Sequence, residues 1–524
     1  MTTANPLDQI STLNEFIETS CATYADLPAY TCLGQTLTFA EVERKSRALA
    51  AWLQNESGLT AGDRVVIQLP NLIQYPIAAY AVLRAGLVIV NTNPLYTRRE
   101  MQHQFCDSGA KGIIILQDLL PNLDEIKAKT QLECVIVTSA TDLLTEDLSY
   151  QHDNYHGFNQ VIAAGDSLTL AANTHAQPDD ICILQYTGGT TGVSKGACLS
   201  HSNIIACVDQ TLDRCGDKFE TGKEVLVCPL PLYHIYAFTV NMMAFFSKGS
   251  LNLLIPNPRD LDQFADALVP HKITGLSGIN TLFVGLCQHP KFKSLDFSAL
   301  KLTFSGGSTL TSATAEIWRE TTGCSVTEGY GLSESSAVVC LNEPGKEHLG
   351  SVGRPTAGTQ VELWDDNDTP VADGQSGQVV VRGPQIMSGY WNMPEETQKV
   401  MSAEGFFKTG DVGVRLPDGC IKIVDRLKDM IIVSGFNVFP NEIEEVLTNH
   451  NNILEAAVIG EPCAKTGEKV CAYITVNALL DSEDVITFCR EHLTAYKVPK
   501  KITVMEQLPK STVGKILRRE LRNS

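Results

Sequence analysis

Residues 186–196, YTGGTTGVSKG, combine four glycines with three threonines, one serine and one lysine. Backbone N–H groups reach phosphate oxygens closely only where no Cβ intervenes, as at glycine. The loop follows an apolar run, ICIL, and precedes a helical pattern that opens at Ser200 or Ser202. The G-x-x-x-x-G-K-[ST] spacing of a Walker A loop is absent. The pattern still predicts phosphate binding over a plain surface turn, through Thr187, Gly188, Gly189, Thr190, Thr191, Gly192 and Lys195.

Two further stretches carry side chains that suit a nucleotide. In TEGYGLSES, residues 327–335, Tyr330 lies between two glycines, so its ring could lie against a planar base. Glu334 follows closely and is a carboxylate suited to Mg²⁺ that bridges phosphates. In FKTGDVG, residues 407–413, Asp411 could accept hydrogen bonds from a ribose diol. Taken alone, each is weak evidence, because such residues usually serve packing, turns or solvation.

The C-terminal stretch PKSTVGKILRREL, residues 509–521, places Lys515 on a glycine turn before a short basic helix. A basic tail is commonly a solvated face, but a lysine on a glycine turn suggests a group inserted into a site. Upstream, VDRLKDMIIVSG brings Arg426, Lys428 and Asp429 together, where a salt-bridged linker is an equally good interpretation. The pair of glycines in FSGGS, residues 304–308, reads best as a turn at the end of a strand.

The elements that must position these residues alternate between short β-branched runs and helical patterns over the first three hundred residues. This rhythm predicts mostly parallel sheets covered by helices. From about Thr359, strands separated by Asp, Asn and Gly turns indicate an antiparallel meander or small barrel. After CIKIVDR comes a tail of about a hundred residues with the pattern of a small α+β domain. A domain boundary is therefore expected near Asp425–Lys428.

Size and composition bound the function classes. A chain of 524 residues predicts three or four folding units. Its formal net charge of −19 argues against a nucleic-acid partner. The N-terminus lacks the pattern of a signal peptide, and the sixteen cysteines form no CxxC pair, which favours a reducing cytosol. No stretch reaches the about 18 apolar residues of a membrane span, so only peripheral membrane contact stays open.

Five motifs in this order and spacing resemble the adenylate-forming superfamily of acyl-CoA synthetases, adenylation domains and luciferases. The resemblance runs from about Thr38 to the C-terminus and is closest to bacterial long-chain fatty-acid–CoA ligases. The matching wording is LQYTGGTTGVSKGA, PLPLYHIYAFTVN, LIPNPRD, IVDRLKDMIIVSGFNVFPNEIE and AYKVPK with LPKSTVGKILRREL. Gly188 and Ser194 depart from the serine and proline that are commoner in the superfamily loop, and the long-chain ligases share the glycine.

The resemblance implies an α/β fold in two domains. A large N-terminal domain, 1–425, would hold two stacked αβ subdomains and a small β-barrel from about 345 to 425. A small mobile α+β domain, 426–524, would follow.

The resemblance also implies roles for single residues. Thr187 to Lys195 would cover the β- and γ-phosphates of ATP, Tyr330 would stack on adenine, and Glu328, Gly329 and Gly331 would shape that slot. Ser333 stands where many relatives have a threonine that contacts phosphate. Glu334 would bind Mg²⁺, and Asp411 and Arg426 would hold the ribose. His234 would lie between the acyl pocket and the α-phosphate. Lys428 would be the hinge, Ser434 and Gly435 would line the pantetheine tunnel, and Lys515 would be the catalytic lysine.

The activity implied is ATP-dependent ligation of a long-chain fatty acid to coenzyme A through an acyl-adenylate, with ATP and Mg²⁺. A medium-chain or aryl, coumarate-type ligase is the nearest alternative, because the ATP machinery is shared. An acyl-AMP ligase serving a carrier protein, a luciferase-like oxygenase and a silent binding module are less favoured. The expected location is cytoplasmic, with peripheral contact at the inner membrane face open, and the family makes a homodimer plausible.

Overall fold

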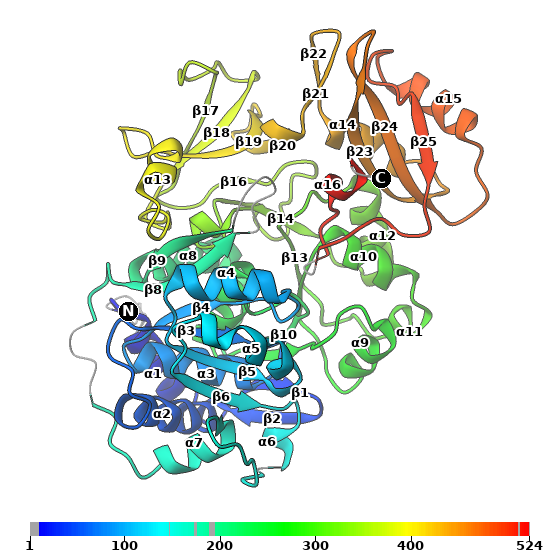
Figure 1. Cartoon of the computed structure of the whole chain (residues 1–524). Helices are drawn as coiled ribbons and strands as arrows, with labels where there is room; N and C mark the ends of the chain where they lie inside the picture. The colour runs from blue at the N-terminus through cyan, green and yellow to red at the C-terminus, as the bar shows by residue number, and fades with distance from the viewer. Residues whose placement is uncertain (1–9, 146, 172–175, 188–193, 512–513, 523–524) are drawn as a thin grey trace, which may run out of the picture. The chain divides into compact units, whose positions relative to one another are not determined.

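The computed structural model describes residues 10–145, 147–171, 176–187, 194–511 and 514–522 (Figure 1). The chain forms two compact units. Unit 1 comprises Met1–Ser277, Gly331–Val338 and Pro384–Lys399, and unit 2 comprises Gly278–Tyr330, Val339–Gly383 and Val400–Ser524. The expected boundary at 425/426 lies inside unit 2 and stays a prediction.

Unit 1 contains a seven-stranded sheet in the order β7–β6–β5–β3–β4–β8–β9, parallel except for the β8–β9 pair. The strands are β3 (Arg64–Gln68), β4 (Val88–Asn91), β5 (Gly112–Leu116), β6 (Cys134–Thr138), β7 (His156–Gly157), β8 (Ile181–Thr187) and β9 (Lys195–Ser200). They are rich in Val and Ile and buried on both faces, as expected of a parallel sheet between helix layers.

The helices of unit 1 cover the two faces of this sheet. Met101 and Phe105 of α4 pack with Leu123 of α5 against one face, on alternate strand residues such as Val66 and Val90. Helices α3 and α2 lie on the other side (Figure 1). The helices are α1 (Leu13–Thr23), α2 (Phe39–Asn55), α3 (Gln74–Arg84), α4 (Arg98–Ser108), α5 (Leu120–Ile126), α6 (Asp142–Thr145), α7 (Phe158–Gly165), α8 (His201–Cys215) and α9 (Leu261–Leu268). Helix α13 (Pro394–Val400) also begins in this unit.

A second sheet in unit 1 runs β12–β10–β11–β1–β2. Its strands are β1 (Pro28–Cys32), β2 (Gln35–Thr38), β10 (Val225–Cys228), β11 (Leu251–Leu254) and β12 (Gly275–Gly278). A fully buried π-helix, Ala237–Phe245, lies between β10 and β11. π-Helical turns are rare and occur frequently at functional sites, which directs attention to the loop before it.

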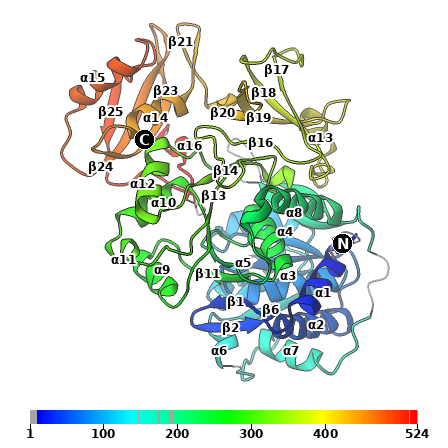
Figure 2. The same ribbon diagram turned by 180° about the vertical axis from the view of Figure 1, so that it is seen from behind.

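Unit 2 begins with four strands in the order β13–β14–β15–β16. They are β13 (Leu302–Ser305), β14 (Thr327–Tyr330), β15 (Cys340–Leu341) and β16 (Arg354–Pro355). Helices α10 (Asn280–Gln288), α11 (Pro290–Lys293) and α12 (Ser312–Thr322) pack beside them, with α10 and α12 adjacent (Figure 2). The fully buried Trp318 of α12 joins the three helices through ring contacts with Phe283 and Phe292.

The segment expected as a meander or small barrel forms an antiparallel sheet of four strands. They are β17 (Gln360–Trp364), β18 (Ser376–Arg382), β19 (Phe407–Arg415) and β20 (Ile421–Arg426), each paired with the next. The β19–β20 register sets Asp411 opposite Arg426.

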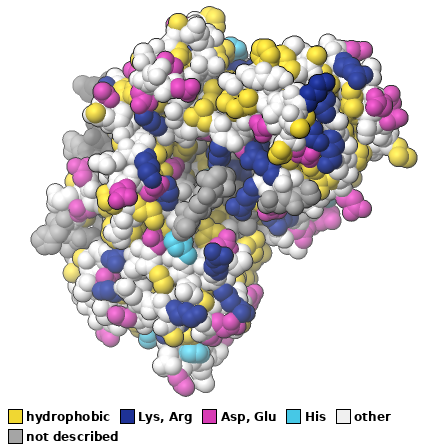
Figure 3. Space-filling view, turned by 45° about the horizontal axis from the view of Figure 1, so that its top comes forward, with side chains coloured by type: hydrophobic (Ala, Val, Ile, Leu, Met, Phe, Trp, Pro, Cys, Tyr) yellow, Lys and Arg dark blue, Asp and Glu magenta, His cyan; other side chains and the backbone are white. Residues whose placement is uncertain are grey.

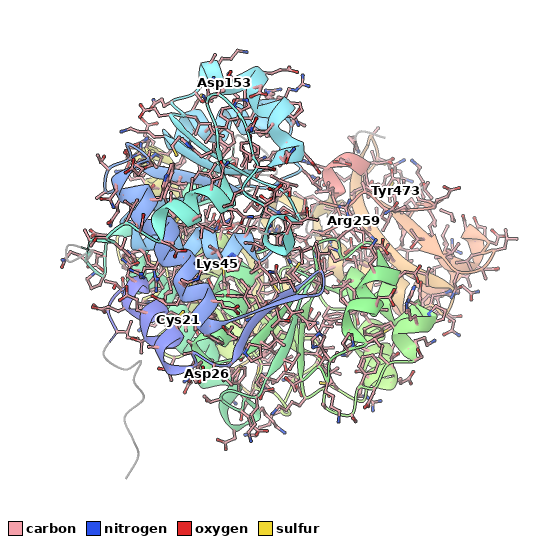
Figure 4. All side chains as sticks on the ribbon, turned by 90° about the horizontal axis from the view of Figure 1, so that it is seen from below. Cys21, Asp26, Lys45, Asp153, Arg259 and Tyr473 are labelled. Atoms are coloured by element: carbon pink, nitrogen blue, oxygen red, sulfur yellow. The ribbon has the colours of Figure 1, made fainter. Side chains whose placement is uncertain are left out.

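The C-terminal part of unit 2 has the predicted α+β pattern. Strands β22–β21–β24–β23 follow one another, and β25 pairs in parallel with β24. The elements are β21 (Ile431–Val433), β22 (Phe436–Val438), α14 (Pro440–Thr448), β23 (Ile453–Cys463), β24 (Gly467–Val476), α15 (Ser482–His492), β25 (Lys501–Val504) and α16 (Arg518–Leu521). Tyr473, labelled in Figure 4, packs with Leu508 and Leu521, so the last residues dock on β24.

The predicted α/β class is confirmed, and helix α8 begins at His201 with Ser200 as its N-cap, as the sequence pattern indicates. Among the described residues, no helix is long and apolar enough to cross a membrane. All sixteen cysteines are free thiols. Figure 3 shows basic and acidic side chains interspersed on the face in view.

Candidate functional site

The two ends of the glycine loop are fixed side by side. Thr187 ends β8 and pairs in register with Lys195, which begins β9. The Ser194 hydroxyl donates to the Thr187 carbonyl at 2.6 Å. Gly188, Gly189, Thr190 and Thr191 lie outside the described residues, so of the predicted loop donors only Thr187 and Lys195 have a structural position.

Lys195 belongs to a polar cluster that includes Glu334. Its ammonium forms an ion pair with Glu396 and lies 5.1 Å from the centre of the Tyr390 ring. The Tyr390 hydroxyl donates to Oε1 of the buried Glu334 at 2.8 Å. Burial, and then the Glu334 carboxylate, raise the pKa of Tyr390, so this hydroxyl keeps its proton and acts as a donor. Lys195 and then Lys399 lower the pKa of Glu396 to about 2.

The segment Gly331–Val338 holds Glu334 in this cluster. A Cβ on Gly331 would lie 1.6 Å from the Ala337 carbonyl oxygen, so only glycine permits the close turn. Ser333 opens a single 3₁₀ turn that includes Glu334, and the Met387 N–H donates to the Glu334 carbonyl at 2.8 Å. The predicted Gly331, Ser333, Glu334 and Lys195 are therefore all in unit 1.

His234 is half-buried in the loop between β10 and the π-helix. The amide of Asn71 fixes this loop, because it donates to the carbonyls of Cys228 and Leu230 and accepts from the Leu232 N–H. Gln185 on β8 donates to the carbonyl of Tyr233 at 3.1 Å. The His234 loop is thus tied to the strand that leads to Thr187.

Three predicted residues meet in unit 2. The Tyr330 hydroxyl donates to Asp411 Oδ2 at 2.6 Å, and Arg426 Nε lies 3.2 Å from Asp411 Oδ1. Asp411 is 4% exposed, while nearly half of the Arg426 side chain is open. Burial, and then the Asp411 carboxylate, raise the pKa of Tyr330 well above its usual range. The arrangement offers a ring, a carboxylate and a guanidinium at one edge of the β19–β20 pair.

Glu328 and Gly329 are on β14 beside Tyr330. The Leu310 N–H donates to Glu328 Oε1 at 3.1 Å. Burial raises the pKa of Glu328 to about 8, Leu310 opposes this and Glu445 adds to it. A Cβ on Gly329 would come within 2.8 Å of Leu341, so a side chain there would crowd the strand pair.

The raised pKa of Glu328 predicts a stability change with pH. In the unfolded chain this carboxyl has an ordinary pKa near 4.5, and in the folded chain about 8. Its neutral form therefore stabilises the fold below about pH 4.5, and that stability is lost as pH rises through about 8, by at most about 1.4 kcal/mol per pH unit. We expect the Glu328→Gln variant, which stays neutral, to lose less stability between pH 5 and 9 than the parent. Denaturant titrations at several pH values test this, and identical pH slopes would contradict it.

Lys515 is held by a network of hydroxyl and backbone contacts. Ser511 accepts from the Lys515 N–H through Oγ at 3.1 Å, and its own N–H donates to the Lys515 carbonyl at 2.7 Å. Thr281 Oγ1 donates to the Gly514 carbonyl at 3.0 Å. A Cβ on Gly307 would lie 3.4 Å from Lys515 Cε and 3.7 Å from Nζ. The lysine therefore lies over the glycine turn that follows β13.

The remaining predicted residues are elsewhere in unit 2. Lys428 is in a short turn after β20, and burial followed by Arg426 lowers its pKa. Ser434 and Gly435 form the exposed turn between β21 and β22, with φ of 53° and 84°. Within the described ranges, no printed bond joins this turn to Lys515.

Sequence reasoning missed three contributors. Tyr390 holds Glu334, and its signal was an aromatic pair, SGYWN, after a glycine. Thr281 and Ser511 fix the Lys515 turn, and Ser511 stands four residues before the lysine in PKSTVGK. Hydroxyl residues next to a glycine turn usually bond the local backbone, which is the signal that could have identified Ser511.

Family models agree with this placement of residues. The model of the AMP-binding enzyme matches residues 17–391, and the model of the AMP-binding enzyme C-terminal domain matches residues 442–515.

The chain belongs to the AMP-binding enzyme family.

Individual relatives of this AMP-binding enzyme cover nearly its whole length. A long-chain-fatty-acid–CoA ligase of Salmonella typhimurium is 43% identical, over 99% of this chain and 95% of the relative. A 4-coumarate–CoA ligase 3 of Oryza sativa is 31% identical, over 98% and 92%. The crystal structure of the anthranilate CoA ligase AuaEII with anthranoyl-AMP superposes with a TM-score of 0.89 at 25% identity, covering 98% of this chain and 96% of that one.

Proposed function

We propose that this AMP-binding enzyme is an ATP-dependent long-chain fatty acid–CoA ligase. The first reaction joins the fatty acid to AMP and releases pyrophosphate, and the second passes the acyl group to the coenzyme A thiol and releases AMP. The observation that carries the proposal is the Lys515 ammonium held over Gly307, in the same unit as the linked Tyr330, Asp411 and Arg426.

The closest competing proposal is a medium-chain or aryl, coumarate-type ligase. The identity of 43% to a long-chain ligase against 31% to a coumarate ligase favours the long-chain assignment. The acyl side of the site is the part that must differ. The loop of His234 leads into the buried, aliphatic and aromatic π-helix Ala237–Phe245, which suits an apolar chain.

In the first reaction, a carboxylate oxygen of the fatty acid attacks the α-phosphorus of ATP and the bond to pyrophosphate breaks. Negative charge builds on the α-phosphoryl oxygens as two anions approach, so positioning and electrostatics dominate the rate. The Lys515 ammonium would answer that charge. Tyr330 would stack on adenine beside Glu328, Gly329 and Gly331, and Asp411 with Arg426 would hold the ribose.

The phosphates and the metal would be held in unit 1. Thr187 and Lys195, with Gly188, Gly189, Thr190 and Thr191 between them, would bind the β- and γ-phosphates, and Ser333 would add a hydroxyl. Glu334 fits Mg²⁺, because it offers a buried carboxylate, the donor that this ion prefers, oriented by Tyr390. When bound, Mg²⁺ would neutralise charge on the phosphates.

We predict that Tyr390→Phe weakens Mg²⁺ dependence selectively. The variant loses the hydroxyl that donates to Glu334 and keeps the ring under Lys195. A hydrogen bond to a charged group contributes about 1.5–3 kcal/mol, so half-maximal Mg²⁺ should rise about tenfold or more. Tyr155→Phe is the matched control, because Tyr155 also donates to a carboxylate, Asp124, outside this cluster. Equal Mg²⁺ titrations for both variants would remove Tyr390 from the metal site.

The second reaction would need Lys515 to leave. We propose that the domain 426–524 turns about Lys428 and presents Ser434 and Gly435 to the pantetheine chain. Their exposure on a hairpin turn supports this role, because an exposed turn can meet a new partner after rotation. Lys428→Pro should therefore spare the first reaction and impair thioester formation.

The decisive assay for substrate class is ATP–pyrophosphate exchange with palmitate, octanoate and coumarate, followed by product analysis with and without coenzyme A. Palmitate should give the fastest exchange, and palmitoyl-CoA should form only when coenzyme A is present. Faster exchange with octanoate or coumarate would favour the competing proposal, and oxidised products without coenzyme A would indicate an oxygenase.

Peripheral membrane contact and a homodimer remain proposals. The basic C-terminal residues give membrane contact little support, because Lys510, Arg518 and Arg522 form ion pairs within the fold. We propose that membrane contact at the inner face, if measured by sedimentation with vesicles of anionic phospholipid, does not depend on Lys510 or Arg522. Loss of vesicle binding on replacing them would contradict this.

A further inference from the structure

Three side chains with metal-binding chemistry meet at the end of the β19–β20 hairpin, outside the residues that the proposed function uses. They are His348, Asp418 and Cys420, and one ligand atom of each lies within 4.8 Å of the others. His348 Nδ1 is 2.7 Å from Asp418 Oδ2. His348 and Asp418 are exposed and Cys420 is buried, so the cluster opens to solvent above a thiol.

The backbone holds the three residues in place. The Leu416 N–H donates to the Cys420 carbonyl at 2.8 Å, and the Cys420 N–H donates to Asp418 Oδ1 at 3.1 Å, which closes the turn. The loop that carries His348 is joined to β20, because Val352 donates to the Ile421 carbonyl at 2.9 Å. His348 is held in turn by Asn342, whose Oδ1 accepts from the His348 N–H at 3.0 Å. Two chain segments that are about seventy residues apart therefore meet at fixed positions.

We propose that His348, Asp418 and Cys420 form a binding site for Zn²⁺. An imidazole, a carboxylate and a thiolate are three ligand types that Zn²⁺ accepts, and the thiolate disfavours Mg²⁺ and Ca²⁺. Bond lengths of about 2.0–2.3 Å in a tetrahedron place the donor atoms roughly 3.3–3.7 Å apart. The His348–Asp418 separation must open by less than an ångström and the thiol must approach. Water would supply the fourth ligand from the open side.

Ion binding releases the Cys420 thiol proton to solvent and replaces the His348–Asp418 hydrogen bond by two metal bonds. Arg354 and Ser351 also face the thiol. The Arg354 side chain belongs to an exposed residue and can turn to water, but its charge opposes a cation. Arg354→Gln should therefore bind the ion more tightly than the parent chain, a gain that a merely structural cluster would not produce.

The test uses Co²⁺ as a spectroscopic probe and Zn²⁺ as its competitor, with the full-length chain. Cys106 is exposed and Cys463 half-exposed, so both are first changed to Ser to remove competing thiols. In this background we expect one Co²⁺ per chain, a sulfur-to-cobalt charge-transfer band, and displacement by Zn²⁺. Cys420→Ser should abolish the band, and His348→Ala should weaken Co²⁺ binding by at least about tenfold.

A second readout separates binding from misfolding. Zn²⁺ should raise the unfolding temperature of the background chain, because it binds the folded state alone, and should leave that of Cys420→Ser unchanged. Circular dichroism checks that the variants fold. A charge-transfer band that persists in Cys420→Ser, or no band in the folded background chain, would overturn the site.

Discussion

Replacing Lys515 by alanine should abolish formation of the acyl-adenylate and leave its conversion to the thioester nearly unchanged. The ammonium lies over the turn at Gly307, where it can meet charge that develops on the α-phosphate. Removing one donor of this kind typically lowers the rate about 10²–10³-fold, or about 3–4 kcal/mol. The first reaction is measured by ATP–pyrophosphate exchange with palmitate, and the second by adding prepared palmitoyl-AMP and coenzyme A.

Lys510→Ala is the matched control for this experiment. Lys510 belongs to the same segment and pairs with Glu455 at 2.7 Å, away from Gly307. We expect both half-reactions to stay close to the parent rates in this variant. If Lys515→Ala slowed both half-reactions equally, the separation of roles between them would be wrong.

The second large effect concerns the buried cation that anchors the C-terminal segment. Arg518 donates to Asp425 at 3.0 Å and to Glu444 at 2.7 Å, and its side chain is 15% exposed. Breaking a buried ion pair by removing one partner costs about 3–5 kcal/mol, because the carboxylates remain buried without compensation. Arg518→Met should therefore lower hydrogen-exchange protection in α14 and β23 by about 10²–10³-fold.

Arg522→Met provides the comparison. Arg522 pairs with Asp429 at 3.0 Å and is more than a third exposed, and pairs of this kind contribute about 0–1 kcal/mol. Protection in α14 and β23 should change little in this variant. Similar losses in both variants would show that burial of Arg518 does not set the stability of this region.

The two variants of Arg518 and Lys515 also distinguish anchoring from chemistry. Arg518 follows Lys515 by three residues, so its loss should slow the first reaction through a looser lysine and reduce exchange protection together. Lys515→Ala should slow the same reaction with protection unchanged. This pairing makes Arg518 a positioning residue and Lys515 the group that meets the substrate.

Much of the fold could be predicted because local signals agreed with each other. Ser200 is followed by a helical pattern and is the N-cap of α8, and the β-branched runs of the first half form the parallel sheet. The glycine before Lys515 has φ of 82°, which a glycine turn requires. Asp411 and Arg426 were chosen as ribose partners by resemblance, and the β19–β20 register sets them opposite one another.

Other parts of the site depend on contacts between distant segments, which a local pattern does not encode. Tyr390 reaches Glu334 across 56 residues, and Thr281 reaches Gly514 across 233. The role of Arg518 also escaped a reading of the tail as a basic surface, because its partners come from β20 and α14. Charge along the chain indicates which residues are ionic, while burial, which decides their energy, follows only from the fold.

The most direct test of the central claim follows a carboxylate oxygen. Palmitate labelled with oxygen-18 in its carboxylate is incubated with the enzyme, ATP and coenzyme A, and the released AMP is analysed by mass spectrometry. An acyl-adenylate intermediate predicts one labelled oxygen in the phosphoryl group of each AMP, because that oxygen bridges carbon and phosphorus before the thiol attacks. Palmitoyl-CoA formed with unlabelled AMP would contradict the account.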